Sequence, residues 1–68
     1  MKTMKELAKE AREQVVEFLL KHPAGSASRI AYLTGSRYVY IEWACREMHE
    51  EGKLNRGYNA GRAVSSLA

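Results

Sequence analysis

The spacing of apolar residues along the first third of the chain predicts a long helix. Thr3 and Glu6 have capping-box spacing at its start. Pro23 is expected to end it, because the residue before a proline is pushed away from helical angles. We therefore expect a helix over residues 3–22. Its apolar positions recur at steps of three and four, as on one face of a helix, and they are Met4, Leu7, Ala8, Ala11, Val15, Phe18 and Leu19.

A second, shorter helix is expected over residues 26–34. Ser26 or Ser28 can cap its start. Gly35 suits the left-handed angle that often follows a helix, and Ser36 suits the N-cap of the next one. A helix of about two turns is not stable alone, so it must pack on its neighbours. The apolar side that it packs with is supplied by Ile30, Ala31 and Leu33.

The third helix is expected over residues 37–51, with Gly52 ending it. Beyond Gly52 the pattern changes to two short strands, residues 53–56 and 62–67, joined by a turn-rich link over residues 57–61. The inward stripe of the third helix follows the same three-and-four spacing and consists of Ile41, Ala44, Cys45 and Met48.

The two strands would form a hairpin over residues 53–67. A two-stranded hairpin is marginal alone, so it must lean on the helices. Residues 24–27 can supply a third strand at its edge. Sixty-eight residues leave room for one core. We therefore expect a single domain over residues 1–68, of the α+β class.

The order and the residues of these elements resemble a winged helix-turn-helix domain, over roughly residues 12–67. Such domains place the third helix in the major groove of DNA and the hairpin, or wing, on the flanking backbone or the minor groove. In size and in its aromatic third helix the chain is similar to the FaeA-like, or PapI-type, regulators of bacterial fimbrial operons. The residues that carry the resemblance are 26–36 and 49–54, with Ile41, Cys45, Met48 and Gly52 at the expected spacing.

The charge of the chain favours a polyanionic partner. Eleven Lys and Arg residues face eight Glu residues, which gives a formal net charge of +3 at pH 7. Residues 53–68 contain Lys53, Arg56 and Arg62 and no acid, so the excess lies in one segment. A concentrated basic patch attracts polyanions better than the same charge spread evenly.

The sequence has few residues that could form a metal site or a catalytic site. No spacing brings His22 and His49 together with Cys45, the one cysteine, as a metal site. The chain has no aspartate, no glycine-rich phosphate loop and no Ser/His/Asp set. We therefore expect no enzyme activity, no cofactor and no metal. The apolar runs are too short for a membrane span or a secretory signal, so we expect no membrane contact and a cytoplasmic location.

The candidate DNA-binding residues come from three places in the sequence. Arginine forks bind guanine or phosphate, and hydroxyl groups donate to phosphate oxygens. Glycines beside the hairpin arginines allow the backbone to approach a phosphate closely. The candidates are Ser26, Ser28 and Arg29 at the start of the second helix, Arg37, Tyr38, Val39, Glu42 and Arg46 on the third helix, and Lys53, Arg56 and Arg62 on the hairpin.

Several of these side chains also fit a purely structural role. Arg46 can contact guanine or phosphate, or it can pair with Glu42 or Glu50, each one turn away on the same helix. One of Tyr38 and Tyr40 is expected at the rim of the core. Trp43 can be an exposed contact residue, or it can cover the base of the wing.

The function predicted from these features is sequence-specific binding of double-stranded DNA by a small transcriptional regulator, of bacterial or mobile-element type. A module this small would act as a dimer or with a larger DNA-bound regulator. The alternative is a winged-helix protein-interaction module with Tyr40, Trp43 and Val39 as its contact patch. The glutamates of the third helix favour the alternative, because they repel phosphates.

Overall fold

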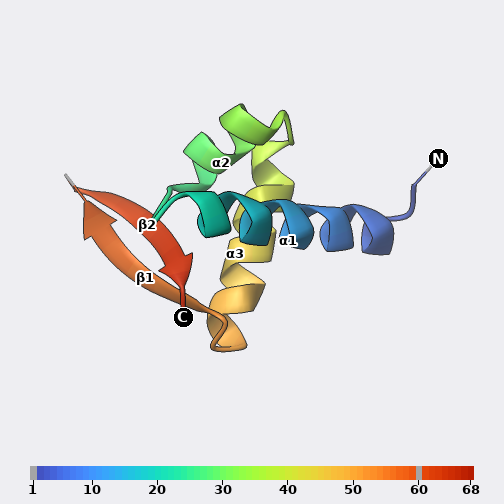
Figure 1. Cartoon of the computed structure of the whole chain (residues 1–68). Helices are drawn as coiled ribbons and strands as arrows, with labels where there is room; N and C mark the ends of the chain where they lie inside the picture. Colours follow the sequence, from blue (N-terminus) through green and yellow to red (C-terminus); the bar gives the residue numbers. More distant parts are fainter. Residues whose placement is uncertain (1, 60) are drawn as a thin grey trace.

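Three helices and a two-stranded sheet make up the computed structural model, which describes residues 2–59 and 61–68 (Figure 1). The two strands pair as one antiparallel hairpin. The α+β class expected from the apolar pattern is therefore confirmed. In chain order the elements are α1 (Met4–Lys21), α2 (Ala27–Thr34), α3 (Tyr38–Glu50), β1 (Leu54–Asn59) and β2 (Arg62–Leu67).

The ends of the first two helices follow local sequence signals. The Thr3 hydroxyl accepts the backbone N–H of Glu6 at 3.2 Å, and the Ser26 hydroxyl accepts that of Arg29 at 3.3 Å. Each bond satisfies a donor that the helix itself leaves unpaired. Gly35 follows α2 in the left-handed conformation, with φ 72°. These caps confirm the predicted helix starts and the turn after α2.

The start of α3 differs from the prediction, because Ser36 is not its N-cap. Arg37 occupies the N-cap position and makes no side-chain capping bond. The Ser36 hydroxyl instead donates to the side-chain oxygen of Gln14 on α1. A partner brought close by the packing of α1 has replaced the local cap.

The core lies where the three helices meet, and β1 closes it. Val15, Ile30 and Ile41 are its fully buried large side chains. The predicted inward stripe of α3 is buried at all four positions. The cluster consists of Ala11, Val15, Phe18, Leu19, Ile30, Ala31, Ile41, Ala44, Cys45, Met48 and Leu54.

Two apolar residues that were expected inside lie on the surface instead. Met4 is 61% exposed, because the first turn of α1 extends past the other helices (Figure 1). Leu33 is 52% exposed, because α2 packs through the face that carries Ile30 and Ala31. The amphipathic pattern therefore predicted the faces of α1 and α2 correctly but overestimated their extent.

The first strand of the hairpin is longer than the sequence predicted. The expected link, residues 57–61, is largely strand, since β1 continues to Asn59. The pairing runs from Leu54 opposite Leu67 to Asn59 opposite Arg62. Partners on β2 satisfy the backbone of this stretch, and so the ladder continues through residues that read as a turn. Ala60, which was part of the expected link, lies outside the described residues.

The expected third strand at residues 24–27 is reduced to a single bridge between Gly25 and Ser65. The Gly25 N–H donates to the Ser65 carbonyl at 3.0 Å, and the Ser65 N–H donates to the Gly25 carbonyl at 2.8 Å. This pair of bonds ties the loop between α1 and α2 to the middle of β2. The wing is thereby held against the helices at a second point besides Leu54.

Candidate nucleic-acid interface

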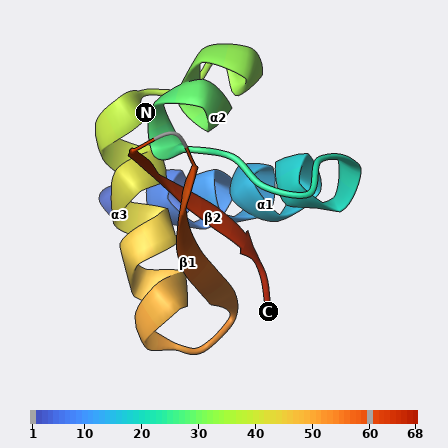
Figure 2. The same ribbon diagram turned by 90° about the vertical axis from the view of Figure 1, so that its left-hand side faces the viewer.

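A groove lies between the start of α2, one side of α3 and the wing, which consists of β1 and β2; we call it the wing groove. Figure 2 shows the hairpin running beside α3, with the start of α2 close to the end of β1 and the start of β2. The groove has a volume of about 390 Å³. It is lined by Ser26, Ala27, Ser28, Tyr38, Glu42, Cys45, Arg56, Arg62, Ala63, Val64 and Ser65.

The wing groove brings together six of the predicted site residues from three separate parts of the sequence. Residues that come from different elements are distant from one another in the sequence. Their meeting depends on the packing of the wing against α2 and α3. The six are Ser26, Ser28, Tyr38, Glu42, Arg56 and Arg62.

The α2 side of the groove presents two hydroxyl groups. Ser26 is committed to capping α2 through the N–H of Arg29. Its oxygen lies 3.3 Å from that of Ser28, and Ser28 is exposed. Arg29 is exposed on the adjoining surface and does not line the groove. This edge therefore offers one solvent-facing hydroxyl donor and a cation near the first turn of a helix.

The α3 side of the groove is a short polar network centred on Glu42. The Arg46 guanidinium donates to Glu42 Oε1 at 3.1 Å, one helical turn away. A hydrogen bond to Glu42 raises the pKa of the Tyr38 hydroxyl above its usual value, and the negative charge of Glu42 adds to the effect. The predicted pairing of Arg46 with a glutamate of its own helix is present in the structure. Glu42 is thus held by partners on both sides.

The floor of the groove is formed where α3 meets β2. Cys45 is buried, and burial raises the pKa of its thiol above the usual value. The Ser65 hydroxyl lies 3.5 Å from Nε2 of His49. Cys45 therefore behaves as a small core residue under the wing rather than as an activated nucleophile.

Two arginines, Arg56 and Arg62, line the groove from the wing, and the register places them on opposite faces of the ladder. Arg56 lies directly opposite the buried Ser65 in the ladder, and so the two side chains share a face of the hairpin. Arg62 stands at the start of β2, near the tip. Both arginines are exposed, and neither forms an ion pair within the part of the chain that the structure describes. Their positive charge is therefore available to a ligand.

Tyr58 is an exposed aromatic residue of the wing that was not among the predicted site residues. It lies on β1 opposite Ala63, on the same face as Arg56 two residues earlier. Its ring is 76% exposed. Residues 57–61 were assigned to a link, so the strand alternation of Leu54, Arg56 and Tyr58 was not recognised. That alternation places Tyr58 on the face that carries Arg56.

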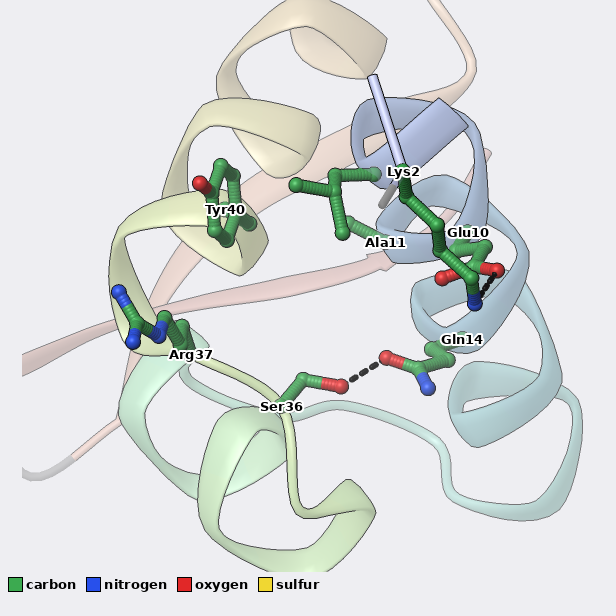
Figure 3. Close-up of a pocket in the computed structure, with 8 residues that line it drawn as sticks. Lys2, Glu10, Ala11, Gln14, Ser36, Arg37 and Tyr40 are labelled. Carbon is green, nitrogen blue, oxygen red and sulfur yellow. Dashed lines mark hydrogen bonds and ion pairs between the residues drawn. The ribbon is translucent and has the colours of Figure 1, made fainter. Parts of the chain in front are cut away.

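Besides Arg29 and Arg46, three further predicted DNA-binding residues do not line the wing groove. Lys53 pairs with Glu51 at 3.4 Å and lines a depression shared with α1. Val39 is 62% exposed on the surface of α3. Arg37 lines a depression between α1 and α3, on whose walls Figure 3 shows Tyr40 and Gln14. The structure gives these residues separate environments.

The aromatic residues of α3 are also separated from one another. Tyr40 is half-buried and packs against the core, as expected for one of the two tyrosines. Trp43 is 40% exposed. It lines a depression with Met4 and Ala8 of α1, and this depression shares no residue with the wing groove. Trp43 therefore does not cover the base of the wing.

Neither a bilayer crossing nor a metal cluster can be assigned from the described residues. In that part of the chain, no helix has both the length and the apolar composition that a membrane span needs. Within the same residues, no three His, Cys, Asp or Glu side chains lie together as metal ligands would.

The three helices followed by a two-stranded antiparallel wing define the winged-helix fold. A solved structure with this arrangement is the X-ray crystal structure of the YusO protein from Bacillus subtilis, with a TM-score of 0.76 and 20% sequence identity. The likeness covers 85% of this chain and 43% of the YusO chain. At this identity it establishes the fold alone. No family model matches the chain, and no curated protein does.

Proposed function

We propose that this protein binds double-stranded DNA as a transcriptional regulator, with α3 in the major groove and the wing on the backbone or in the minor groove. The observation that carries the proposal is the wing groove. One basic, hydroxyl-bearing surface unites the start of α2, α3 and the tip of the wing. Phosphate contacts position a protein on DNA, and side chains on base edges give specificity. Arg56 and Arg62 supply the first kind of contact, and α3 supplies the second.

The unpaired state of the wing arginines strengthens the proposal. Two other basic residues predicted to bind DNA are partly neutralised, since Arg46 is paired with Glu42 and Lys53 with Glu51. Arg56 and Arg62 keep their full charge. A guanidinium without a protein partner keeps its donors free for phosphate oxygens or for a narrow minor groove.

The proposal is tested by reversing the charge of the wing. We expect Arg56→Glu with Arg62→Glu to abolish retention on a random duplex pool at low salt, because two phosphate contacts become repulsions. Neutralising both residues should make the plot of log affinity against log salt less steep by about 1.8 units. The measurement is fluorescence anisotropy of the duplex pool over a salt series.

The matched control is Lys5→Glu with Lys9→Glu on α1. This variant has the same change in net charge, and both residues are exposed and remote from the wing groove. It should retain DNA binding. Unchanged binding by the wing variant, or equal loss in the control, would count against the proposal.

A second candidate function is supported by Trp43. A tryptophan that is 40% exposed beside a Met4 that is 61% exposed forms an apolar patch of the kind found at protein contacts. We propose this patch as a protein-contact surface. It lies outside the wing groove, so contact with a protein and binding of DNA are compatible.

The remaining expectations are part of the same proposal. The narrower resemblance to FaeA-like, or PapI-type, regulators is supported by the aromatic third helix. We further propose that the protein works as a dimer or with a larger DNA-bound regulator, in a bacterial cytoplasm. The proposed role is that of a binding protein rather than an enzyme.

A further inference from the structure

The wing groove contains a negative charge in a place where DNA binding alone does not call for one. Of the described residues that line the groove, Glu42 is the acidic one, and it faces a surface that also carries Arg56 and Arg62. A carboxylate repels phosphate, and so a groove that only gripped the DNA backbone would be weakened by it. Glu42 becomes favourable only where the ligand presents a hydrogen-bond donor.

Glu42 is also held in place rather than left mobile. Its side chain is 41% exposed, and Oε1 accepts from Arg46 at 3.1 Å. Tyr38, one turn before Glu42, also lines the groove. An exposed i,i+4 ion pair contributes little to the stability of a helix, so stability alone explains little of this arrangement. The ion pair instead places an acceptor that lines the groove, Glu42, beside a donor on the exposed surface of α3, Arg46.

We propose that Glu42 and Arg46 together read one C·G base pair in the major groove, with Glu42 accepting from cytosine N4 and Arg46 donating to guanine O6 and N7. The inference rests on the proposed function and deepens it by naming the base pair. In the major groove the donors are the amino groups of cytosine and adenine, and the acceptors of guanine suit an arginine fork. Glu42 and Arg46 offer the complementary acceptor and donors.

The spacing of the two side chains fits the edge of a base pair. Cytosine N4 and guanine O6 are hydrogen-bonded to each other, so they lie about 2.9 Å apart. Glu42 Oε1 and Arg46 Nη2 lie 3.1 Å apart. The hydrogen-bond acceptor and donor of the protein are therefore separated by nearly the same distance as the donor and acceptor of the base pair.

An A·T pair satisfies this arrangement less well. Adenine N6 and thymine O4 offer the same order of donor and acceptor, but adenine N7 beside N6 is an acceptor and repels the carboxylate. Thymine O4 gives arginine one acceptor and a neighbouring methyl group, where guanine gives two acceptors. The pair Glu42–Arg46 is therefore selective for C·G.

The test is selection of binding sites from a randomised duplex pool by the wild-type chain and by Glu42→Gln. The wild type should select one C·G pair that is favoured over T·A on the order of ten- to a hundredfold. Glutamine pairs with adenine N6 and N7, so Glu42→Gln should lose that preference or move it to A·T at this one position. Its affinity for the pool as a whole should not fall, because a repulsive charge has been removed.

The matched control is Glu50→Gln, which removes the same charge from an exposed residue of the same helix outside the groove. It should select the wild-type site. Replacing the selected guanine by 7-deazaguanine removes N7, and it should weaken the wild type but not Arg46→Ala.

The outcomes separate this inference from the function on which it rests. A wild-type chain that retains no duplex overturns the proposed function and the base-pair reading together. A wild-type chain that selects a site which Glu42→Gln selects equally overturns the base-pair reading alone, and the ion pair is then only a surface contact of α3.

Discussion

Gly25 is the residue at which the loop between α1 and α2 passes closest to the core. A Cβ atom added there would lie 2.6 Å from Cε1 of Phe18. The Phe18 ring is buried and stacks on His22 with ring centroids 4.3 Å apart, so it has little room to move. The backbone of Gly25 also makes both hydrogen bonds to Ser65. Because Gly25 has no Cβ atom, its backbone can lie against Phe18 and pair with Ser65, and this pairing anchors the wing.

At this scale we predict that Gly25→Ala lowers the free energy of unfolding by about 1–3 kcal/mol, the usual cost of overpacking. The wing should loosen as well, because the added methyl group displaces the backbone that pairs with Ser65. Urea unfolding gives the first quantity, and hydrogen exchange of the Ser65 amide gives the second.

Gly57→Ala is the comparison variant for this prediction. Gly57 lies in β1, has no atom within 4 Å of an added Cβ and has no positive φ. The variant should be neutral or more stable by about 0.4–1 kcal/mol, because alanine restricts the unfolded chain. Equal unfolding midpoints for the two variants would contradict the steric role assigned to Gly25.

At the scale of the elements, a bidentate ion pair joins the middle of α1 to the end of α3. Arg12 donates to both carboxylate oxygens of Glu51, and the Nη1–Oε2 distance is 3.1 Å. Glu51 is the C-cap of α3, where a negative charge opposes the helix dipole. The hydrogen bond from Arg12 compensates for this and lowers the pKa of Glu51 below its ordinary 4.5. Lys53 contributes in the same direction.

We therefore predict a pH-dependent contribution of this ion pair to stability. The pKa of Glu51 is lower in the folded chain than in the unfolded one, so the contribution is complete above the ordinary value of 4.5. It is lost as the pH falls below that value and through the folded pKa. Glu51→Gln should melt below the wild type at pH 7 and together with it at the acid end.

The measurement is the melting temperature of both proteins by circular dichroism from pH 7 to pH 3. Glu13→Gln is a suitable control, since Glu13 is exposed on α1 and forms no ion pair among the described residues. A difference between Glu51→Gln and the wild type that persists undiminished at low pH would show that charge pairing is not its cause.

At the scale of the whole molecule, two surfaces of different chemistry lie apart. The wing groove is polar and basic, and it lies between α2, α3 and the hairpin. The patch of Trp43 and Met4 lies between α1 and α3. In Figure 1 the wing and the start of α1 are at opposite ends of the molecule. One helix, α3, contributes to both surfaces.

We predict that substitutions on the two surfaces act independently. Trp43→Gln should leave the affinity for a DNA duplex within about twofold, as for a surface change remote from a site. Arg56→Ala should weaken binding and make its salt dependence less steep by about 0.9 units. Anisotropy titrations of both variants measure this. Comparable losses in the two would mean that the surfaces belong to one interface.

How far the sequence could predict this structure depends on how far apart in the sequence the contacting residues lie. The caps of α1 and α2, the turn at Gly35 and the buried stripe of α3 depend on residues three to eleven positions apart, so the pattern predicted them. The end of β1 was mispredicted, because the glycine and asparagine content of residues 57–61 is locally typical of a turn. Ser36 was mispredicted because its partner, Gln14, is distant in sequence.

Local periodicity and composition are therefore enough to predict three helices, their inward faces, a basic C-terminal segment and the resemblance to a winged helix. The tertiary structure decided which candidates meet. It placed Glu42 with Arg56 and Arg62 in one groove, and it moved Trp43 and Lys53 to other surfaces. The physical reason is that strand register and helix packing are set by long-range burial and backbone pairing, which no window of the sequence contains.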